Sequence, residues 1–446
     1  MIVEFKVGNY RSFKEIVTFS MVASNISSRN KKLDENATFL VDEKLTLLKC
    51  AAIYGANASG KSNLIYAIDF MRNLIRNSSR ESQVEEPIDV EPFRLSEDTV
   101  DKPSFFQMVF VLAGKRYRYG FEVNQKRIVS EWLFHVPTTR ESRLFVRDEN
   151  GISISSVFKE GKGIEDKTRP NALFLSVVAQ FNGELSKKIL AWFKMLRTYS
   201  GIYARRNYGY TAALLQSPKH REGVLQLIKA LDLDFDSLEV SKIPIPLPTL
   251  KANADEEMPE ELKAVMGKLV DIAQELTNLM PEDGPNYKTI KTSHQKYDSK
   301  GRPIAYEVFD LHLHESEGTK KLVALAGSLV DVLKHGKVFI IDELDRSLHP
   351  LITCAIIQLF NSNETNPQNA QLIFATHDTN LLSNKIFRRD QIWFTEKDRY
   401  GATHLYSLVE YRIRNDASFE SDYILGKYGA IPFIGDLRRL IGEPSV

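Results

Sequence analysis

Cysteine is scarce in this chain, whose 446 residues include only Cys50 and Cys354. Each lies in an apolar stretch, and neither has a second cysteine or a histidine at the spacing of a metal site. A disulfide scaffold and a cysteine-rich zinc site are therefore excluded. We expect the chain to work in a reducing compartment, the cytoplasm.

Long apolar runs are missing too, and so is an excess of charge of either sign. No window reaches the roughly 18 consecutive apolar residues that mark a membrane span, so we expect no membrane partner. Lys and Arg number 59 and Asp and Glu number 58, a net charge of +1, so composition alone demands no polyanionic partner. Hydrophobic residues make up 43% of the chain, as in an ordinary globular protein, and the length suggests two or three domains.

The spacing of apolar residues predicts an α/β protein. Residues 47–54 form a short apolar run closed by Gly55, which is typical of a buried strand, and residues 63–76 carry apolar side chains at helical spacing. Alternating patterns predict two strands around the turn 9–12 and an antiparallel β meander over 104–147. Residues 24–46 are predicted to form a loop, residues 77–103 an exposed polar segment, and residues 171–200 a helix.

A segment of different character follows, which we interpret as a helical insertion over 201–302. It carries helical patterns near 220–231 and 260–280, an acidic cluster over 255–261, and Pro244, Pro246 and Pro248, which exclude a central strand. Beyond it, apolar runs at 338–341 and 372–375 each follow a helix-compatible segment. This order predicts parallel strands with helical crossovers.

Gly55-Ala56-Asn57-Ala58-Ser59-Gly60-Lys61-Ser62 is a complete phosphate-loop motif. Its glycines let backbone N–H groups turn toward phosphate oxygens, and the following helix presents its N-terminal dipole. Lys61 is expected to reach the β- and γ-phosphates of ATP, and the Ser62 hydroxyl is expected to bind Mg²⁺. The preceding strand and the following helix supply the context that the motif needs.

Three further groups suit the same chemistry. Asp342 and Glu343 end an apolar strand, where Asp342 is expected to hold Mg²⁺ and Glu343 to act as general base on water. His377 follows another apolar strand, where it could contact a γ-phosphate or be a capping or buried histidine, and the residue by itself favours the second reading. Ser316 and Gly318 precede a helix and form a second anion-binding end, which would serve a second subunit.

Together these motifs resemble the head of an ABC-type AAA-family ATPase, the RecF, SMC and OLD-like class found in bacterial anti-phage systems such as RloA, AbiL and the PARIS-type ATPase. The resemblance covers about 1–200 and 303–400, with the motifs in the family's order. It implies an α/β head made of 1–200 and 303–400, an antiparallel β subdomain, the insertion over 201–302, and an extension over 401–446. Neither the long coiled coil of SMC proteins nor the nuclease domain of OLD-like proteins is found.

The resemblance also implies further roles. Arg11, in the opening Asn9-Tyr10-Arg11-Ser12-Phe13, and Asn57 and Asn63 would bind nucleotide, and Gln180 would be the Q-loop ligand of nucleotide and Mg²⁺. Ser316 and Gly318 would be the signature motif, although Glu315 replaces its usual leading leucine. Residues 346–350 would be the D-loop. Lys61, Glu343 and His377 would be catalytic.

Three functions follow from this interpretation. The first is an ATPase that associates with itself and controls a separate, co-encoded nuclease or toxin in abortive infection. We expect that effector to dock on residues 201–300. The second is a RecF-type repair ATPase that acts on nucleic acid, for which the basic and aromatic residues Arg197, Tyr199, Tyr203, Arg205, Arg206, Tyr208 and Tyr210 are a candidate surface. The third is a scaffold whose ATP is structural.

Overall fold

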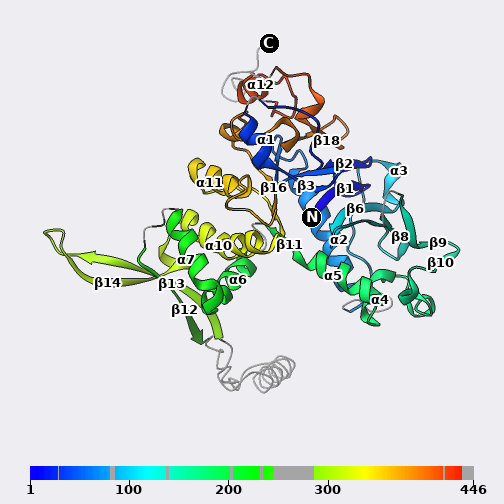
Figure 1. The fold of residues 1–446 in the computed structure, drawn as a ribbon, viewed down its shortest axis with the longest axis horizontal. Coiled ribbons are helices and arrows are strands. Elements are labelled where there is room, and N and C mark those ends of the chain that lie inside the picture. The colour runs from blue at the N-terminus through cyan, green and yellow to red at the C-terminus, as the bar shows by residue number, and fades with distance from the viewer. Residues whose placement is uncertain are drawn as a thin grey trace, which may run out of the picture. The chain divides into compact units, whose positions relative to one another are not determined.

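The computed structural model describes residues 1–28, 30–80, 86–136, 140–200, 204–231, 233, 235–244, 286–414 and 417–433, except for the side chains of 204–206, 242–244 and 286–288. The predicted helix over 260–280 and the acidic cluster over 255–261 lie outside these residues. The chain divides into two compact units, one of residues 1–204 with 328–446 and one of residues 205–327 (Figure 1).

The first unit contains a six-stranded sheet with β5 (Cys50–Tyr54) near its centre. On one side β5 pairs in parallel with β16 (Gln371–Ala375), and on the other it pairs in parallel with β17 (Ile392–Lys397). The strand order is β11 (Leu196–Tyr199), β15 (Val338–Ile341), β16, β5, β17 and β18 (Thr403–Ser407). The strands β5, β15 and β16 are buried along their whole lengths, which confirms the strands predicted from their apolar runs.

A seven-stranded antiparallel sheet forms the second layer. Its order is β10 (Gly151–Ile154), β9 (Ser142–Asp148), β8 (Ile128–Val136), β7 (Lys115–Val123), β6 (Ser104–Leu112), β1 (Ile2–Gly8) and β2 (Val17–Ser20). The meander predicted over 104–147 is therefore confirmed, as are the two strands around the turn at 9–12.

Helix α2 (Lys61–Asn77) contributes the buried face that joins these layers into one core. Its residues Leu64, Ile68, Met71 and Ile75 recur at helical spacing and are all buried. The helices α4 (Phe174–Gln180), α5 (Glu184–Met195) and α11 (Pro350–Phe360) accompany it in this unit, with the shorter helices α3 (Glu97–Val100) and α12 (Phe419–Ile424).

The start of α4 is fixed by a buried carboxylate. Glu131 of β8 is fully buried and accepts hydrogen bonds from the backbone N–H groups of Phe174 (2.6 Å) and Leu175 (3.0 Å). The Tyr119 hydroxyl donates a third bond at 2.8 Å. These bonds satisfy helix N–H groups that have no partner within the helix. Burial raises the pKa of Glu131, while Arg147 opposes the shift.

Two expectations for the first unit were wrong. Residues 24–46, predicted as a loop, contain α1 (Lys31–Ala37), β3 (Thr38–Asp42) and part of β4 (Leu45–Leu48). These elements are too short for a periodic signal. The helix predicted over 171–200 gives way to β11, whose strand conformation depends on pairing with β15, far along the chain.

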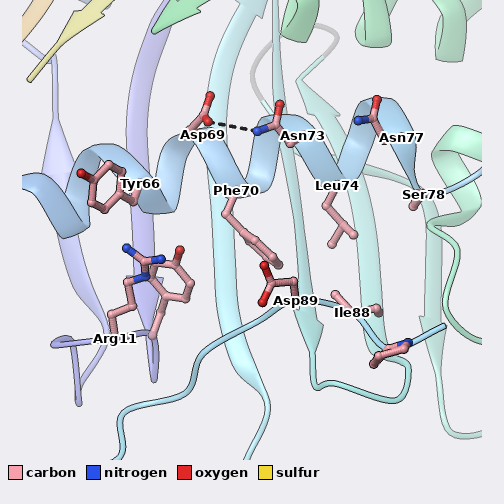
Figure 2. A pocket seen from close by; sticks show the side chains of 12 residues that line it. Arg11, Tyr66, Asp69, Phe70, Asn73, Leu74, Asn77, Ser78, Ile88 and Asp89 are labelled. Atoms are coloured by element: carbon pink, nitrogen blue, oxygen red, sulfur yellow. Dashed lines mark hydrogen bonds between the residues drawn. The ribbon is translucent and has the colours of Figure 1, made fainter. Parts of the chain in front are cut away.

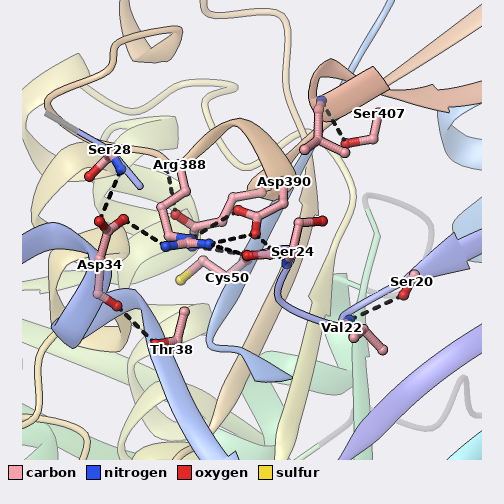
Figure 3. A network of polar contacts seen from close by, with 12 residues as sticks. Ser20, Val22, Ser24, Ser28, Asp34, Thr38, Cys50, Arg388, Asp390 and Ser407 are labelled. Atoms are coloured by element: carbon pink, nitrogen blue, oxygen red, sulfur yellow. Dashed lines mark hydrogen bonds and ion pairs between the residues drawn. The ribbon is translucent and has the colours of Figure 1, made fainter. Parts of the chain in front are cut away.

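A buried ionic network holds the segment around α1 against the C-terminal part of the unit (Figure 3). The Arg388 guanidinium, 4% exposed, contacts Asp390 at 2.8 Å and Asp34 at 2.6 Å. It also donates to the Ser24 carbonyl at 3.0 Å, and the Ser28 N–H donates to Asp34 at 2.9 Å. The carboxylates surround the guanidinium and raise its pKa despite the cost of burial.

The second unit combines helices with a small sheet that the sequence did not predict. The helices are α6 (Ala204–Gln216), α7 (Pro218–Ala230), α9 (Leu311–His314) and the beginning of α10 (Glu317–His335). The antiparallel sheet has the order β12 (Ser237–Pro244), β13 (Asn286–Tyr297) and β14 (Pro303–Asp310). Pro244 is the last residue of the edge strand β12. Proline is tolerated at this position because it has no N–H group to donate, whereas a central strand would need one. Within the described residues of both units, no helix is both long and apolar enough to cross a membrane.

Candidate functional site

The phosphate loop is the turn from β5 into α2, as predicted. Gly55 (φ 154°) and Gly60 (φ 113°) both have positive φ, which L side chains rarely adopt. A Cβ atom at Gly55 would collide with the Thr395 carbonyl oxygen, and one at Gly60 would collide with the Thr403 side chain. Glycine is therefore required at both positions by conformation and by space.

Residues from both ends of the chain hold this loop in place. The Thr403 hydroxyl of β18 donates to the Ser59 carbonyl at 2.8 Å and lies 2.8 Å from the Ser12 hydroxyl. The Asn63 side-chain amide donates to Ser12 at 2.7 Å, and the Ser59 and Thr395 hydroxyls are 2.7 Å apart. Asn63 thus lies beside the loop and supports it through Ser12.

Lys61 is buried at the foot of the loop, with 5% of its surface exposed. Its ammonium group donates to the carbonyl oxygens of Gly55 (2.8 Å) and Ala56 (2.9 Å). Burial lowers the pKa of Lys61 to about 8, although the carboxylates of Asp342 and Glu343 oppose that shift. A phosphate group at the loop would supply the negative charge that favours the protonated amine.

Asp342 follows β15 and faces the start of α2. The Ser62 hydroxyl donates to the Asp342 carboxylate at 3.1 Å. Asp342 is 8% exposed, and burial raises its pKa while the bond from Ser62 opposes the rise. The structure therefore brings together the two side chains that were predicted to hold Mg²⁺.

Glu343 comes next and turns toward the same space. It has a φ of 52°, an unusual conformation for a residue with a long side chain, and its carboxylate pairs with Arg346 at 3.0 Å. Strained backbone of this kind is common at functional sites. The pairing links the predicted general base to the segment predicted as the D-loop.

His377 completes the group. Its backbone N–H faces both carboxylate oxygens of Asp345 at 3.4 Å. Burial and the charge of Lys61 lower the pKa of His377, which favours the neutral imidazole, although the nearby carboxylates oppose the shift. A cavity of about 460 Å³ gathers these side chains; it is lined by Asn57, Ala58, Ser59, Gly60, Lys61, Ser62, Asn63, Glu343, His377 and Lys397.

The structure does not bring Arg11 or Gln180 to this cavity. Arg11 lies over the Tyr66 ring at 4.9 Å and lines a separate cavity of about 430 Å³ with Asp69 and Phe70, as Figure 2 shows. Gln180 ends α4, which packs on the opposite end of α2 from the phosphate loop, where the Ser176 hydroxyl donates to the Ile75 carbonyl at 2.6 Å. The nucleotide-binding roles that the family resemblance implies for Arg11 and Gln180 stay predictions.

The donors present fit a magnesium ion held partly by phosphate. Among the described residues, no group of three or more His, Cys, Asp or Glu side chains could hold a metal by itself. One hydroxyl and one carboxylate, Ser62 and Asp342, are oxygen donors of the kind that Mg²⁺ prefers. Mg²⁺ keeps several waters and takes its remaining ligands from a bound phosphate, so a two-residue set is sufficient.

Residues 50–383 match the family described as "AAA domain, putative AbiEii toxin, Type IV TA system". The chain belongs to this AAA family. No curated protein matches it. Among solved structures, this AAA chain is similar to the SMC head domain from Thermotoga maritima (13% identity, 91% of this chain and 98% of that chain, TM-score 0.39). It is also similar to an SMC head bound to the C-winged helix domain of ScpA (14% identity, 91% and 97%, TM-score 0.40).

The predicted signature residues of the AAA chain lie in the second unit, at the start of α10. Ser316 is exposed, and its hydroxyl accepts from the Thr319 N–H at 3.1 Å, so it caps the N-terminus of the helix. Glu315, the residue before Ser316, accepts from Thr292 (2.5 Å) and His294 (2.7 Å) of β13. These hydrogen bonds attach the segment predicted as the signature to the neighbouring sheet.

Sequence reasoning missed Lys397, Asp345 and Thr403. Lys397 ends β17, which runs parallel to β5, so its side chain reaches the phosphate-loop end of the sheet. No motif marks these residues. The only available signal was that the carboxyl ends of neighbouring parallel strands share one edge of a sheet.

Proposed function

We propose that this AAA chain binds ATP with Mg²⁺ and hydrolyses it. The observation that carries this proposal is the convergence of Lys61, Ser62, Glu343 and His377 on one cavity at the carboxyl edge of the sheet, where Ser62 also donates to the Asp342 carboxylate at 3.1 Å. Lys61 exchanges its bonds to loop carbonyls for phosphate oxygens, and Ser62 and Asp342 hold the metal. When bound, Mg²⁺ neutralises phosphate charge.

Glu343 acts as the general base in this proposal. It lies beside the phosphate loop and is already oriented by Arg346 at 3.0 Å. His377, with its neutral form favoured, is suited to hydrogen-bond with the γ-phosphate and to sense its loss. The backbone N–H groups of the loop and of the first turn of α2 contribute fixed positive charge without reorganisation.

The test is phosphate release by the purified chain. Glu343→Gln should keep ATP binding but lower turnover by about 10²-fold or more, because a positioned base supplies a factor of that size. Glu364→Gln, at an exposed position, is the matched control and should not change turnover. An unchanged rate in Glu343→Gln would show that another group activates the water.

We further propose, first, that two copies of the chain form composite ATP sites. We propose, second, that ATP turnover controls a separate nuclease or toxin in an anti-phage system similar to those of RloA, AbiL and the PARIS-type ATPase. The start of α10 at Ser316 and Gly318 supports the first part, because Ser316 is exposed and the N-terminus of a helix attracts negative charge. The family's description connects the chain with toxin–antitoxin systems, which supports the second part.

Co-expression with the neighbouring genes tests effector control. The chain alone should not arrest growth, whereas the chain with its effector should do so under phage challenge. Lys61→Ala should abolish this response without changing the amount of either protein. Arrest by the chain alone would make the chain itself the toxin, and a response that survives Lys61→Ala would exclude control by ATP.

Direct action on nucleic acid is the second candidate, because one cavity of the first unit is strongly basic. It has a volume of about 470 Å³, and its lining includes Arg76, Arg80, Lys187 and Lys194 with Gln180 and Asn182. No acidic side chain lines it within the described part of the chain. The predicted basic and aromatic cluster fits less well, because Arg197 pairs with Asp331 at 3.5 Å and Tyr199 is buried in β11. Tyr203 and the side chains of Arg205 and Arg206 lie outside the described residues.

Lys194→Glu tests this candidate against Lys188→Glu, an equal charge change on the same helix outside the cavity lining. A labelled single-stranded oligonucleotide should bind less tightly to the first variant only. For that variant, the slope of log affinity against log salt concentration should decrease by the amount expected for about one phosphate contact. Equal effects of the two variants would indicate attraction by net charge alone.

A further inference from the structure

The strand β14 is an open edge with an apolar stripe. It pairs only with β13 in the order β12-β13-β14, so its outer N–H and C=O groups have no strand partner within the described part of the unit. Ile304, Tyr306 and Val308 alternate along it and share one face, since side chains repeat every two residues. They are 59%, 60% and 57% exposed. Natural proteins rarely leave such an edge without a partner.

The strands β13 and β14 form a two-stranded ribbon that is held by packed aromatic rings at its base and by an ion pair between the strands. Its outer part therefore extends from a well-packed base. Phe309 packs on His294 with ring centroids 5.1 Å apart and on His314 at 5.3 Å. Lys296 and Glu307 pair across the two strands at 3.0 Å. In Figure 1 the β13–β14 ribbon extends beyond the helices of its own unit.

The sequence of β14 is complementary to itself in the antiparallel direction. If two copies pair with Tyr306 opposite Tyr306, then Ile304 of one lies opposite Val308 of the other, and the apolar stripe continues across both strands. Ala305 lies opposite Glu307, so the two glutamates do not face each other. Pro303 lies opposite Phe309, so no like charges face each other within the strand pair.

We propose that β14 pairs with β14 of a second copy of this chain, forming a continuous six-stranded sheet around a twofold axis. This interface is independent of ATP, because it uses no residue of the phosphate-loop cavity. A symmetric dimer with the same patch on both subunits is the commonest form of oligomer. Main-chain hydrogen bonds supply affinity, and the stripe centred on Tyr306 fixes the register.

Disulfide trapping tests the register. The experiment uses the full chain carrying Lys61→Ala, which removes association driven by ATP, and Cys354→Ser, which leaves only the buried Cys50. Tyr306→Cys should form a covalent dimer with oxidised glutathione as oxidant, because directly opposed Cα atoms lie about 4.5–5.5 Å apart, within the range of a disulfide. Glu307→Cys, on the other face and opposite Ala305, should remain monomeric on a non-reducing gel.

Light scattering tests the interface without a new cysteine. Tyr306→Asp should raise the dimer dissociation constant by roughly 30-fold or more, the loss expected at a central aromatic contact. Tyr400→Asp, an equally exposed tyrosine of the first unit, should leave it unchanged. The proposal would be overturned if cysteines at both 306 and 307 formed covalent dimers, or if the wild-type chain were monomeric without nucleotide. The apolar stripe would then be assigned to another protein or to residues 245–285 of the same chain.

Discussion

The buried phosphate-loop lysine leads to a prediction about protons. Lys61 without a phosphate partner has a pKa of about 8, against an ordinary value of 10.5. Binding of ATP places negative charge beside its ammonium group and should return the pKa to at least the ordinary value. ATP binding should therefore be coupled to proton uptake that increases as the pH rises through about 8.

The magnitude follows from the two pKa values. The protein should take up about 0.1 proton per ATP at pH 7, about 0.5 at pH 8 and about 0.9 at pH 9. Affinity should accordingly fall about tenfold between pH 7 and pH 9. Phosphate groups themselves are fully ionised in the upper half of this range, since their second pKa is near 6.

Isothermal titration calorimetry at pH 9 measures the uptake directly, in buffers that differ in ionisation enthalpy. Lys61→Arg is the control, because a guanidinium stays charged throughout and should remove the uptake even if affinity changes. Affinity that is independent of pH, with no proton uptake by the wild type, would mean that Lys61 is already fully charged in the free protein. The burial argument would then be refuted.

Two further predictions concern stability and the second subunit. Arg388→Ala should lower the free energy of unfolding by about 3–5 kcal/mol, because it leaves Asp390, which is 3% exposed, buried without its cation. Urea denaturation measures the loss, which should be much smaller for the control Arg389→Ala. Ser316→Arg should abolish hydrolysis but keep ATP binding; mixing it with Lys61→Ala should restore part of the activity, because each mixed pair contains one intact composite site. No recovery in verified mixed pairs would point to self-contained sites.

The parts of the fold that were predictable are those with a strong local signal. The apolar runs of β5, β15 and β16 reveal buried strands, and a glycine loop between a strand and a helix predicts a phosphate site. Asp342 and Glu343 could be placed at the end of a strand because they follow such a run. In each case neighbouring residues carry enough information to define the local structure.

The rest depends on partners far away in the chain. β11 is a strand because it lies beside β15, and Thr403 supports a loop made of residues more than 340 positions earlier. The family resemblance implied that Gln180 and Arg11 bind nucleotide, whereas in the structure α4 packs on the far end of α2 from the phosphate loop, and Arg11 stacks on Tyr66. Order along the chain cannot reveal at which end of a helix a later segment packs.

The central position of β5 has a consequence for the chain during synthesis. Residues 50–54 leave the ribosome early, but their two neighbours in the sheet are residues 371–375 and 392–397, and the loop's last support is Thr403. At about 5–20 residues per second, translation needs roughly 20–70 s to supply them. During that time a fully apolar strand has no partner, and no nascent chain can hold nucleotide. Newly made chains should therefore need chaperone protection, and under the proposed function ATP should engage only chains whose six-stranded sheet is complete.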